Sequence, residues 1–385
     1  MQTFIGAHAS ADVANLALRY KDVDGVPIAL LIDQILGRRK AKIKIPEYYH
    51  DARIVFPPSL NLEQSSSEAT AQWKAKRIPA GALGVDLSGG FGVDARWMST
   101  RFDRYEFVEP DASLLAMVRY NHLALGCGNV SYHALTAEQF LHASTNVFDF
   151  IYIDPSRRSG GNNRVVTFEH CVPDVIRLRE QLERRAGMLM IKASPLLDIR
   201  SGLTSLGGKY RVIVLAVKNE CKEVVFMSDS AITGHDATIE AIDIGADTIT
   251  EFKFSQEEER LAAATTGSLE KFIYVPNAAV LKAGAFKLIT SRYPVKKLHP
   301  NTHLYTSGRL VEGFPGRSFE VDTELKPGAA AGNFPDGYAN IISRNYPLSA
   351  DELKKKMGLT DGGDYYLIAF TSIDGKHLVR ARRTS

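Results

Sequence analysis

The stretch Gly84-Val85-Asp86-Leu87-Ser88-Gly89-Gly90-Phe91-Gly92 decides the fold class of this 385-residue chain. The apolar run Leu83–Leu87 predicts a buried strand with Asp86 near its end. The glycines that follow predict a turn into a helix, where a ligand can approach the backbone and find free N–H groups. A buried strand, a glycine-rich turn and a helix together predict the first unit of a nucleotide-binding α/β sheet.

Short apolar runs continue this pattern along the middle of the chain. They lie at Leu83–Leu87, Tyr105–Val108, Val130–His133, Phe148–Ile153, Met188–Ile191, Tyr210–Val217 and Val224–Ser228. Helical patterns between most of them predict repeated βα units and a mainly parallel, Rossmann-like sheet. Only Lys218–Glu223 separates the last two runs, too few residues for a crossover helix, so these runs should form a terminal antiparallel hairpin.

The first 80 residues have a helical pattern. Ala11–Leu18 and Pro27–Leu36 show apolar residues at helical spacing, and Gly37 is expected to end the second helix. Ser65-Ser66-Ser67-Glu68 matches a capping box and predicts a helix that runs to about Arg77.

The pattern of apolar and polar residues changes again after residue 230. Ala237–Ile244 and Thr248–Phe254 alternate like an exposed edge pair of strands. Ser349–Met357 is a predicted helix, and Tyr365–Ile373 with His377–Arg382 is a predicted hairpin. We therefore expect a helical domain over 1–80, the sheet domain over 81–255, a connecting segment over 256–306 and a small α+β domain over 307–385.

The composition is that of an ordinary globular protein, with 45% hydrophobic and 24% charged residues. It excludes disordered, collagen-like and disulfide-rich classes. Cys127, Cys171 and Cys221 form no C-x-x-C pair, which argues against structural zinc and for a reducing compartment. The N-terminal sequence lacks a signal-peptide layout, and no apolar run approaches roughly 18 residues. We expect a soluble, cytoplasmic protein with no membrane segment and no metal.

Charge is unevenly distributed along the chain. Residues 1–80 carry 11 basic and 8 acidic residues, residues 81–269 carry 19 and 25, and residues 270–385 carry 17 and 11. An acidic centre between basic ends favours an anionic partner for the ends, although solvated surfaces explain the same counts. The cluster Arg38–Lys44 and the C-terminal Arg380, Arg382 and Arg383 are candidate phosphate contacts.

Two cofactor classes fit the glycine-rich turn. Gly90-x-Gly92-x-x-Ala95 satisfies the dinucleotide fingerprint, and Glu109, seventeen residues after Gly92, is placed to accept both hydroxyls of a ribose. The other candidate is S-adenosylmethionine (SAM), whose sites place an acid before the glycines, where Asp86 stands. Because like charges repel, a pyrophosphate gains nothing from that carboxylate. Asp86 and the terminal hairpin favour SAM.

A second signal follows the fourth strand, where Asp154 and Pro155 come directly after Phe148–Ile153. Ligands of open α/β sheets bind at the carboxyl ends of strands, so Asp154 should emerge in the site. Its carboxylate and a neighbouring carbonyl can hold an amine with its lone pair facing a methyl donor. Methyl transfer is an in-line displacement, in which orientation does much of the work. A simple Asp-Pro turn that caps the next element is the structural alternative.

These residues resemble the class I SAM-dependent methyltransferases. Asp86-x-Ser88-x-Gly90-x-Gly92 resembles their first motif, Glu109 matches the acid that ends strand two, and Asp154–Arg157 resembles the D/N-P-P-x motif of amino-directed nucleic-acid methyltransferases. The whole chain is similar to bacterial methyltransferases with a THUMP-like C-terminal domain. That similarity rests on Glu63–Glu68, Asp154–Arg158, Lys192–Pro195 and Phe314–Arg317.

The resemblance implies roles for individual residues. Those expected to hold SAM are Asp86, Ser88, Gly90, Gly92, Glu109 and Thr136. Asp154 and Pro155 are the expected catalytic residues. The sequence departs from the family where Ser156 replaces a second proline, where Arg157 replaces a stacking aromatic residue, and where strand three ends in Thr136 without the common Gly-Asp.

The basic loop after Pro155 is a candidate for holding substrate. Arg157, Arg158 and Arg164 can pair with phosphate through bidentate guanidinium contacts, and Lys192, which follows strand five, can line the same crevice. An ordinary surface loop is the alternative interpretation. No cysteine lies at the mouth of strand four or five, so a covalent cysteine mechanism has no candidate.

The resemblance predicts a SAM-dependent methyltransferase that acts on a base nitrogen of tRNA or rRNA. RNA is the expected partner because THUMP domains are associated with RNA modification. Two alternatives stay open: a small-molecule or protein methyltransferase, and a non-catalytic RNA-binding protein with a degenerate SAM pocket.

Overall fold

The computed structural model describes residues 1–157, 167–207, 210–229, 237–326 and 331–384. The chain forms two compact units. Unit 1 comprises residues 1–212 and 223–235, and unit 2 comprises residues 213–222 and 236–385. Each unit is described by itself.

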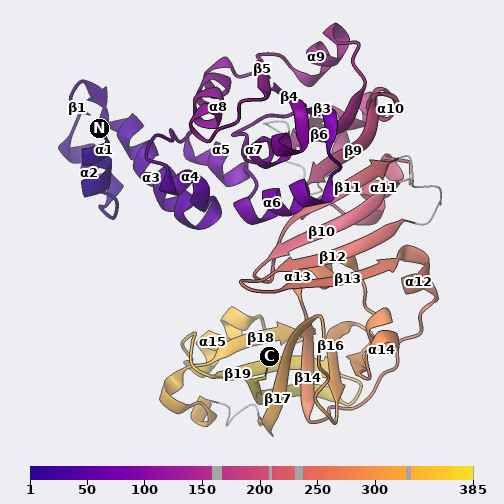
Figure 1. Ribbon diagram of the computed structural model, residues 1–385. Helices are drawn as coiled ribbons and strands as arrows, with labels where there is room; N and C mark the ends of the chain where they lie inside the picture. The colour runs from indigo at the N-terminus through magenta and orange to yellow at the C-terminus, as the bar shows by residue number, and fades with distance from the viewer. Residues whose placement is uncertain (158–166, 208–209, 230–236, 327–330, 385) are drawn as a thin grey trace. The chain divides into compact units, whose positions relative to one another are not determined.

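Short helices and a two-stranded ribbon form the N-terminal part of unit 1 (Figure 1). They are α1 (Gln2–Ala7), α2 (Val13–Arg19), β1 (Asp22–Val23), β2 (Val26–Pro27), α3 (Ile28–Lys44), α4 (Pro46–His50), α5 (Ser59–Gln64) and α6 (Glu68–Arg77). The expected helix up to Arg77 is confirmed, but Ser67 caps it by accepting a hydrogen bond from the backbone N–H of Thr70. The predicted Ser65–Glu68 capping box is therefore wrong in register.

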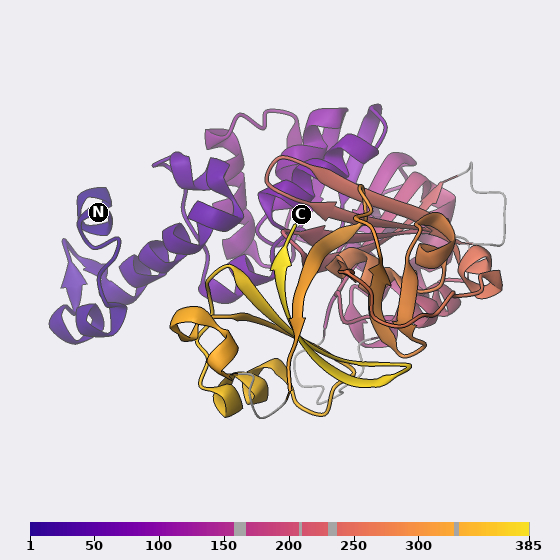
Figure 2. The same ribbon diagram turned by 90° about the horizontal axis from the view of Figure 1, so that it is seen from below.

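Helix α3 continues past Gly37, so the predicted helix end at this glycine is wrong. The long indigo helix is seen in Figure 2. Gly37 is instead a packing residue, because a Cβ atom there would lie 2.4 Å from the Cβ atom of Phe56. The cluster Arg38–Lys44 is the second half of this helix. Its side chains bind carbonyl groups of the same unit: Arg39 contacts Ala9, and Lys44 contacts Leu62 and Glu63.

The mainly parallel sheet expected from the sequence is confirmed. Its strand order is β13-β12-β10-β11-β9-β6-β3-β4-β5. The parallel strands, which pair directly with their neighbours, are β3 (Gly81–Asp86), β4 (Phe102–Val108), β5 (Val130–His133), β6 (Phe148–Ile153) and β9 (Ala186–Ala193). The intervening helices are α7 (Val93–Met98), α8 (Ala112–Ala124), α9 (Ala137–Ala143), α10 (Val175–Arg185) and α11 (Ile199–Ser205).

The terminal hairpin is formed by β10 (Arg211–Val217) and β11 (Glu220–Asp229), which are neighbours in the sheet. Lys218 and Asn219 connect them with φ of 51° and 65°. Two left-handed residues in a two-residue loop match the twist of the strands that they join. Strand β11 runs antiparallel to β9, and the antiparallel pair β12 (Thr238–Ile244) and β13 (Ile249–Ser255) ends the sheet as the alternating pattern predicts.

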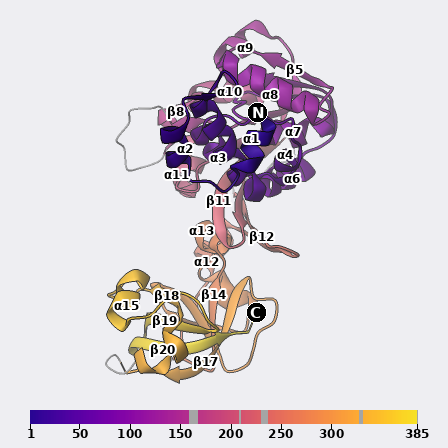
Figure 3. The same cartoon turned by 90° about the vertical axis from the view of Figure 1, so that its left-hand side faces the viewer.

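A second sheet of seven strands lies in unit 2, with helix α15 (Ala350–Met357) at its flank (Figure 3). Its order is β15-β16-β14-β17-β20-β19-β18. The strands are β14 (Phe272–Pro276), β15 (Lys296–His299), β16 (Thr302–Ser307), β17 (Gly316–Glu324), β18 (Asn340–Arg344), β19 (Tyr365–Ser372) and β20 (Gly375–Arg383). The predicted C-terminal hairpin and the Ser349–Glu352 capping box are confirmed.

Strand β19 is buried on both faces of this sheet. Ile368 and Phe370 belong to one apolar cluster, and Leu367 and Ala369 belong to another. Because successive residues of a strand point to opposite faces, the sheet separates two cores. Helix α15 contributes Leu353 to the second core.

The region expected to be a connecting segment carries several elements. Residues 256–306 contain α12 (Gln256–Leu261), α13 (Ala278–Ala283) and α14 (Leu288–Arg292), and β14, β15 and most of β16. These three strands belong to the same sheet as β17–β20. The domain boundaries drawn at residues 80, 255 and 306 remain a proposal.

Candidate functional site

Asp86 is the last residue of β3 and is almost completely buried. Its Oδ1 atom accepts hydrogen bonds from the backbone N–H of Ser88 at 2.9 Å and from the Ser88 hydroxyl at 3.0 Å. Burial raises the pKa of Asp86 to about 7, and the nearby carboxylates of Asp94 and Asp154 add to this effect against the Ser88 hydrogen bonds. A cation placed beside this carboxyl group would favour its ionised form.

The glycine turn after Asp86 adopts backbone conformations that favour glycine. Gly90 and Gly92 have φ of 59° and 74°. A Cβ atom on Gly92 would also lie 2.7 Å from Val118 and 2.8 Å from Nε2 of His122. Nε2 of His122 lies 2.9 Å from the carbonyl oxygen of Gly92. Burial lowers the pKa of His122 to about 4, so a neutral ring donates to this carbonyl and holds the turn.

Glu109 directly follows β4 and contacts the same turn. Its Oε2 atom accepts the backbone N–H of Gly90 at 2.8 Å, and its Oε1 atom accepts that of Asp111 at 2.9 Å. Burial raises the pKa of Glu109, and these two hydrogen bonds oppose the rise. The predicted ribose acid is therefore a fixed carboxylate at the edge of the glycine turn.

Thr136 follows β5 and caps α9. Its hydroxyl accepts the backbone N–H of Gln139 at 3.2 Å, and the Gln139 side chain accepts that of Thr136 at 3.0 Å. The ends of the neighbouring strands β3, β4 and β5 thus present Asp86, Glu109 and Thr136 along one edge of the sheet. A contact between Thr136 and the cofactor stays a prediction.

Asp154 and Pro155 directly follow β6, as expected from the sequence. The backbone N–H of Asp154 donates to the Ser88 hydroxyl at 2.7 Å. This hydroxyl in turn donates to Asp86, so Ser88 connects the ends of β3 and β6. A glycine at this position would have no side-chain atom that could make this link. The Asp154 side chain is 34% exposed, which leaves it accessible to a ligand.

Lys192 holds the Asp154 carboxylate. It lies on β9, next to β6, and its Nζ atom is 2.5 Å from Oδ2 of Asp154. Burial alone would lower the pKa of Lys192, but the carboxylates of Asp154, Asp94 and Glu223 raise it. Burial raises the pKa of Asp154, and Lys192 opposes that rise. The structure thus brings Lys192 to the site, where its ammonium group is paired with the Asp154 carboxylate.

A buried polar cluster that the sequence did not predict lies behind this pair. Nζ of Lys74 is 2.9 Å from Oδ1 of Asp94 and 2.8 Å from Oε2 of Glu223. The Ser66 hydroxyl donates to Asp94 at 2.7 Å and accepts from Lys74 at 2.9 Å and from Lys192 at 3.3 Å. Lys74 and Lys192 therefore share the Ser66 hydroxyl, which lies two residues before α6 and links this helix to the lysine that holds Asp154.

Tyr152 completes this cluster from β6. Its hydroxyl donates to Oδ2 of Asp94 at 2.7 Å. Lys74 and Lys192 oppose the effect of burial on Asp94 and hold its pKa below the usual value. Three carboxylates, from Asp94, Asp154 and Glu223, face two ammonium groups here, so the site has an excess of negative charge.

A weak sequence signal for this cluster did exist. Lys74 falls among the buried residues Thr70, Ala71 and Ala75 of α6, where a solvated lysine would be out of place. Lys192 likewise interrupts the apolar end of β9. Buried lysines are rare unless they are paired, so charges within apolar patterns point to partners elsewhere in the chain.

The expected substrate loop is described only in part. Arg157 belongs to the short strand β7 (Ser156–Arg157), which pairs with β8 (Cys171–Val172). Arg158 and Arg164 lie outside the described residues. Within the described ranges, no group of three or more His, Cys, Asp or Glu side chains is arranged to hold a metal. No helix in this part of the chain is long and apolar enough to cross a membrane.

Comparisons with known proteins add to this geometry. Residues 272–315 match a family model described as a ferredoxin-like domain, and residues 316–383 match one described as THUMP domain-like. A solved structure titled "putative methyltransferase" from Porphyromonas gingivalis W83 is 29% identical, with a TM-score of 0.86, over 100% of this chain and 97% of that one. None of the curated proteins matches the chain.

A shorter solved structure also matches. It is titled a "putative methyltransferase" from Streptococcus mutans in complex with SAH and is 11% identical, with a TM-score of 0.31, over 42% of this chain and 94% of that one.

The sheet order, the inserted antiparallel strand β11 and the acids at the ends of β3 and β4 define a class I SAM-dependent methyltransferase. Its residues 316–383 are similar to a THUMP-like domain, and over its whole length the chain is similar to the solved Porphyromonas gingivalis structure.

Proposed function

We propose that this methyltransferase transfers a methyl group to a base nitrogen of tRNA or rRNA. The observation that carries the proposal is the position of Asp154, which follows β6, stays partly exposed and is linked through Ser88 to Asp86. The THUMP-like match over residues 316–383 and the basic excess over 270–385 support an RNA substrate.

The residues around the glycine turn fit SAM. Asp86 would bind the cationic amino group of its methionine part, because the pKa of Asp86 near 7 lets a nearby cation ionise it at neutral pH. Glu109 would accept the ribose hydroxyls, and the backbone is open at Gly90, where a Cβ atom would have only the Ser88 carbonyl oxygen within 4 Å. SAM supplies a methyl group on a positively charged sulfur. The excess of carboxylates in the site would favour binding of this cation.

Asp154 would orient the nitrogen that receives the methyl group. Lys192 engages Oδ2, which leaves Oδ1 to accept an N–H from the base. That hydrogen bond turns the nitrogen lone pair toward the methyl group, and correct orientation lowers the barrier of an in-line transfer. Pro155 would contribute its carbonyl as a second acceptor. Arg157, Arg158 and Arg164 would contact phosphates at this edge.

Incubation with methyl-labelled SAM and total RNA, followed by mass spectrometry of the nucleosides, tests the proposal. We expect label in a base of tRNA or rRNA. Asp154→Ala should lower the transfer rate by about a hundredfold or more while SAM still binds, in line with the loss of an orienting group. The exposed Asp103, on β4, gives a matched control as Asp103→Asn.

Other outcomes separate the alternatives. Label in a small molecule or a protein, with none in RNA, would move the substrate to that class. RNA binding without transfer to any RNA would favour a non-catalytic binding protein. Normal transfer by Asp154→Ala would show that this carboxylate is not catalytic.

A further inference from the structure

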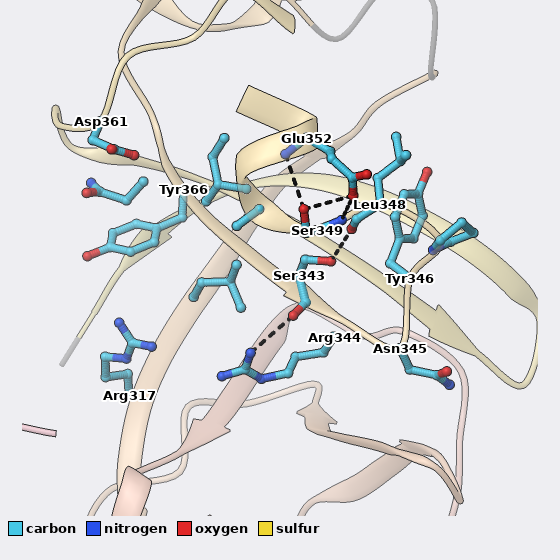
Figure 4. A pocket seen from close by; sticks show the side chains of 15 residues that line it. Arg317, Ser343, Arg344, Asn345, Tyr346, Leu348, Ser349, Glu352, Asp361 and Tyr366 are labelled. Atoms are coloured by element: carbon cyan, nitrogen blue, oxygen red, sulfur yellow. Dashed lines mark hydrogen bonds between the residues drawn. The ribbon is translucent and has the colours of Figure 1, made fainter. Parts of the chain in front are cut away.

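Unit 2 contains a cavity outside the site described above. It has a volume of about 800 Å³ and lies between β17, β18, β19 and the start of α15 (Figure 4). This volume is within the range of about 300–1,000 Å³ that is typical of small-ligand sites. Its lining includes two arginines, two asparagines and two carboxylates, so it is predominantly polar.

One wall of the cavity is basic. Arg317, on β17, and Arg344, at the end of β18, lie on the same side of the view (Figure 4). Among the described residues neither guanidinium has a carboxylate partner, and the buried Nε atom of Arg317 has no hydrogen-bond acceptor. Burial lowers the pKa of Arg317, and the charges of Arg383 and Arg344 lower it further.

The remaining wall offers hydrogen-bond acceptors. The side-chain amides of Asn340 and Asn345 donate hydrogen bonds to the carbonyl oxygen of Gly363 and to the hydroxyl of Thr302. Their amide oxygens therefore remain as acceptors. Glu352 accepts from the backbone N–H and the hydroxyl of Ser349, both at 2.8 Å, which keeps its pKa low. The cavity is therefore bipolar: the guanidinium groups of Arg317 and Arg344 lie on one side of the view, and the carboxylates of Glu352 and Asp361 lie on the other (Figure 4).

This bipolarity distinguishes between anionic ligands. An acidic peptide would place further carboxylates near Glu352, where like charges repel. Asp361 is already paired with Lys354 and does not take part in this repulsion. A nucleotide brings one strongly anionic phosphate, which suits paired guanidinium groups, together with hydroxyl and amine donors that suit the opposite wall. Tyr366 also lines the cavity and packs against Phe319, with ring centroids 4.8 Å apart.

We propose that the cavity between β17, β18, β19 and α15 binds one nucleotide through its phosphate, with Arg317 and Arg344 as the phosphate ligands. The nucleotide can be free or part of an RNA strand. The proposal goes beyond the methyl transfer proposed above and does not depend on the acceptor atom.

Fluorescence anisotropy of a labelled single-stranded RNA octamer measures its binding to the full-length protein. Titration with AMP measures binding of the free nucleotide. We expect Arg344→Ala and the double variant Arg317→Ala/Arg344→Ala to weaken binding by about tenfold or more. Loss of one phosphate contact should flatten the dependence of log K on log salt by about 0.7. Binding of the octamer but not of AMP would place the nucleotide within a strand, and the reverse result would make it a free ligand.

The exposed Arg309, in the same unit but outside the lining of this cavity, provides the matched control as Arg309→Ala. This control should bind within about twofold of the wild type. Circular dichroism checks folding, and the exposed Arg344 can be judged alone if the double variant unfolds. Unchanged affinity and salt slope in Arg344→Ala, or no binding of either probe by the wild type, would overturn the proposal. If no methyl transfer were detected while nucleotide binding was intact, only the proposed function would be contradicted.

Discussion

The Ser88 hydroxyl accepts the backbone N–H of Asp154 at 2.7 Å and so ties the Asp-Pro turn to the first glycine turn. The same hydroxyl donates to Asp86. The group expected to bind the cofactor and the group expected to orient the acceptor therefore share one oxygen atom. A displacement of either turn would disturb both.

Ser88→Ala should impair catalysis more than folding. Asp154 loses the acceptor of its backbone N–H, and Asp86 loses a donor, which raises the pKa of its carboxyl group further. We expect kcat for methyl transfer to fall about tenfold, consistent with about 1–1.5 kcal/mol for one hydrogen bond. Steady-state kinetics measure this decrease in kcat. Ser131→Ala is the control, because Ser131 is an exposed serine on β5. An unchanged kcat would mean that the link has no catalytic role.

Lys192→Met should make methyl transfer dependent on pH. Without the ammonium group, the pKa of Asp154 rises because only Lys74 then opposes the effects of burial and of Asp94. At pH 7 a larger share of Asp154 is protonated and cannot accept the N–H of a base. We expect kcat/KM to fall at least about tenfold at pH 7 and to recover partly toward pH 9, which a pH–rate profile measures.

The same variant should also unfold more readily. Removing one partner of a fully buried ion pair costs about 3–5 kcal/mol. Because the Asp154 side chain is 34% exposed, we expect a loss below this range, which urea unfolding measures. Lys222→Met is the control, since this lysine is 37% exposed and pairs with Glu220. If the ratio of kcat/KM between wild type and Lys192→Met were the same at every pH, the positioning role would be contradicted.

Asp86 should make the stability of the ligand-free protein fall as pH rises. Its pKa is raised from 3.8 to about 7, so between these values the folded state binds more protons than the unfolded state. The free energy of unfolding then decreases by up to about 1.4 kcal/mol per pH unit in this window. Urea unfolding at pH 5 and pH 7.5 should show a steeper loss in the wild type than in Asp86→Asn.

SAM should reverse this trend, because its cationic amino group favours ionised Asp86. We expect its affinity to increase as pH rises toward 7 in the wild type and to depend little on pH in Asp86→Asn. Calorimetry in two buffers with different ionisation enthalpies should detect proton release on binding. Equal pH dependence in both proteins would refute this assignment.

Gly37→Ala should destabilise unit 1 although alanine favours helices. The new Cβ atom would lie 2.4 Å from the Cβ atom of Phe56, whose side chain is buried and has little room to move. Overpacking costs about 1–3 kcal/mol, more than the gain in helix propensity of about 1 kcal/mol. Gly6→Ala in α1 is the matched control, because a Cβ atom there would have no other atom within 4 Å and stability should rise slightly. Thermal unfolding compares the two variants.

The parts of the fold with a strong local pattern were predictable. Val130–His133 and Phe148–Ile153 are the observed strands β5 and β6, because apolar runs between turns specify buried strands. Gly37 misled the prediction because tertiary packing against Phe56 outweighs the helix-breaking tendency of glycine. Strand β14 was missed although Phe272–Pro276 is a continuous apolar run, because the turn signal Pro276-Asn277 ends it. Strand β15 was missed because Lys296–His299 contains only one apolar residue.

The site was predictable where one strand end carries its own chemistry, as at Asp86, Glu109 and Asp154. The partners of Asp154 were not predictable in the same way. Lys74, Asp94 and Glu223 are distant in sequence, and their contacts depend on the folding of α6, α7 and β11 around one buried point. Ser88 was expected only to hold the cofactor, but in the structure its hydroxyl also accepts the backbone N–H of Asp154.

The division of the chain into units has a practical consequence. The polypeptide passes from unit 1 to unit 2 after residue 212, returns after 222 and leaves again after 235. A single cleavage therefore cannot separate the two units into intact polypeptides, since each unit needs a segment from the far side of the cut. Any gene fragment that encodes the THUMP-like region alone, from residue 316, would also omit β14, β15 and β16 of its own sheet.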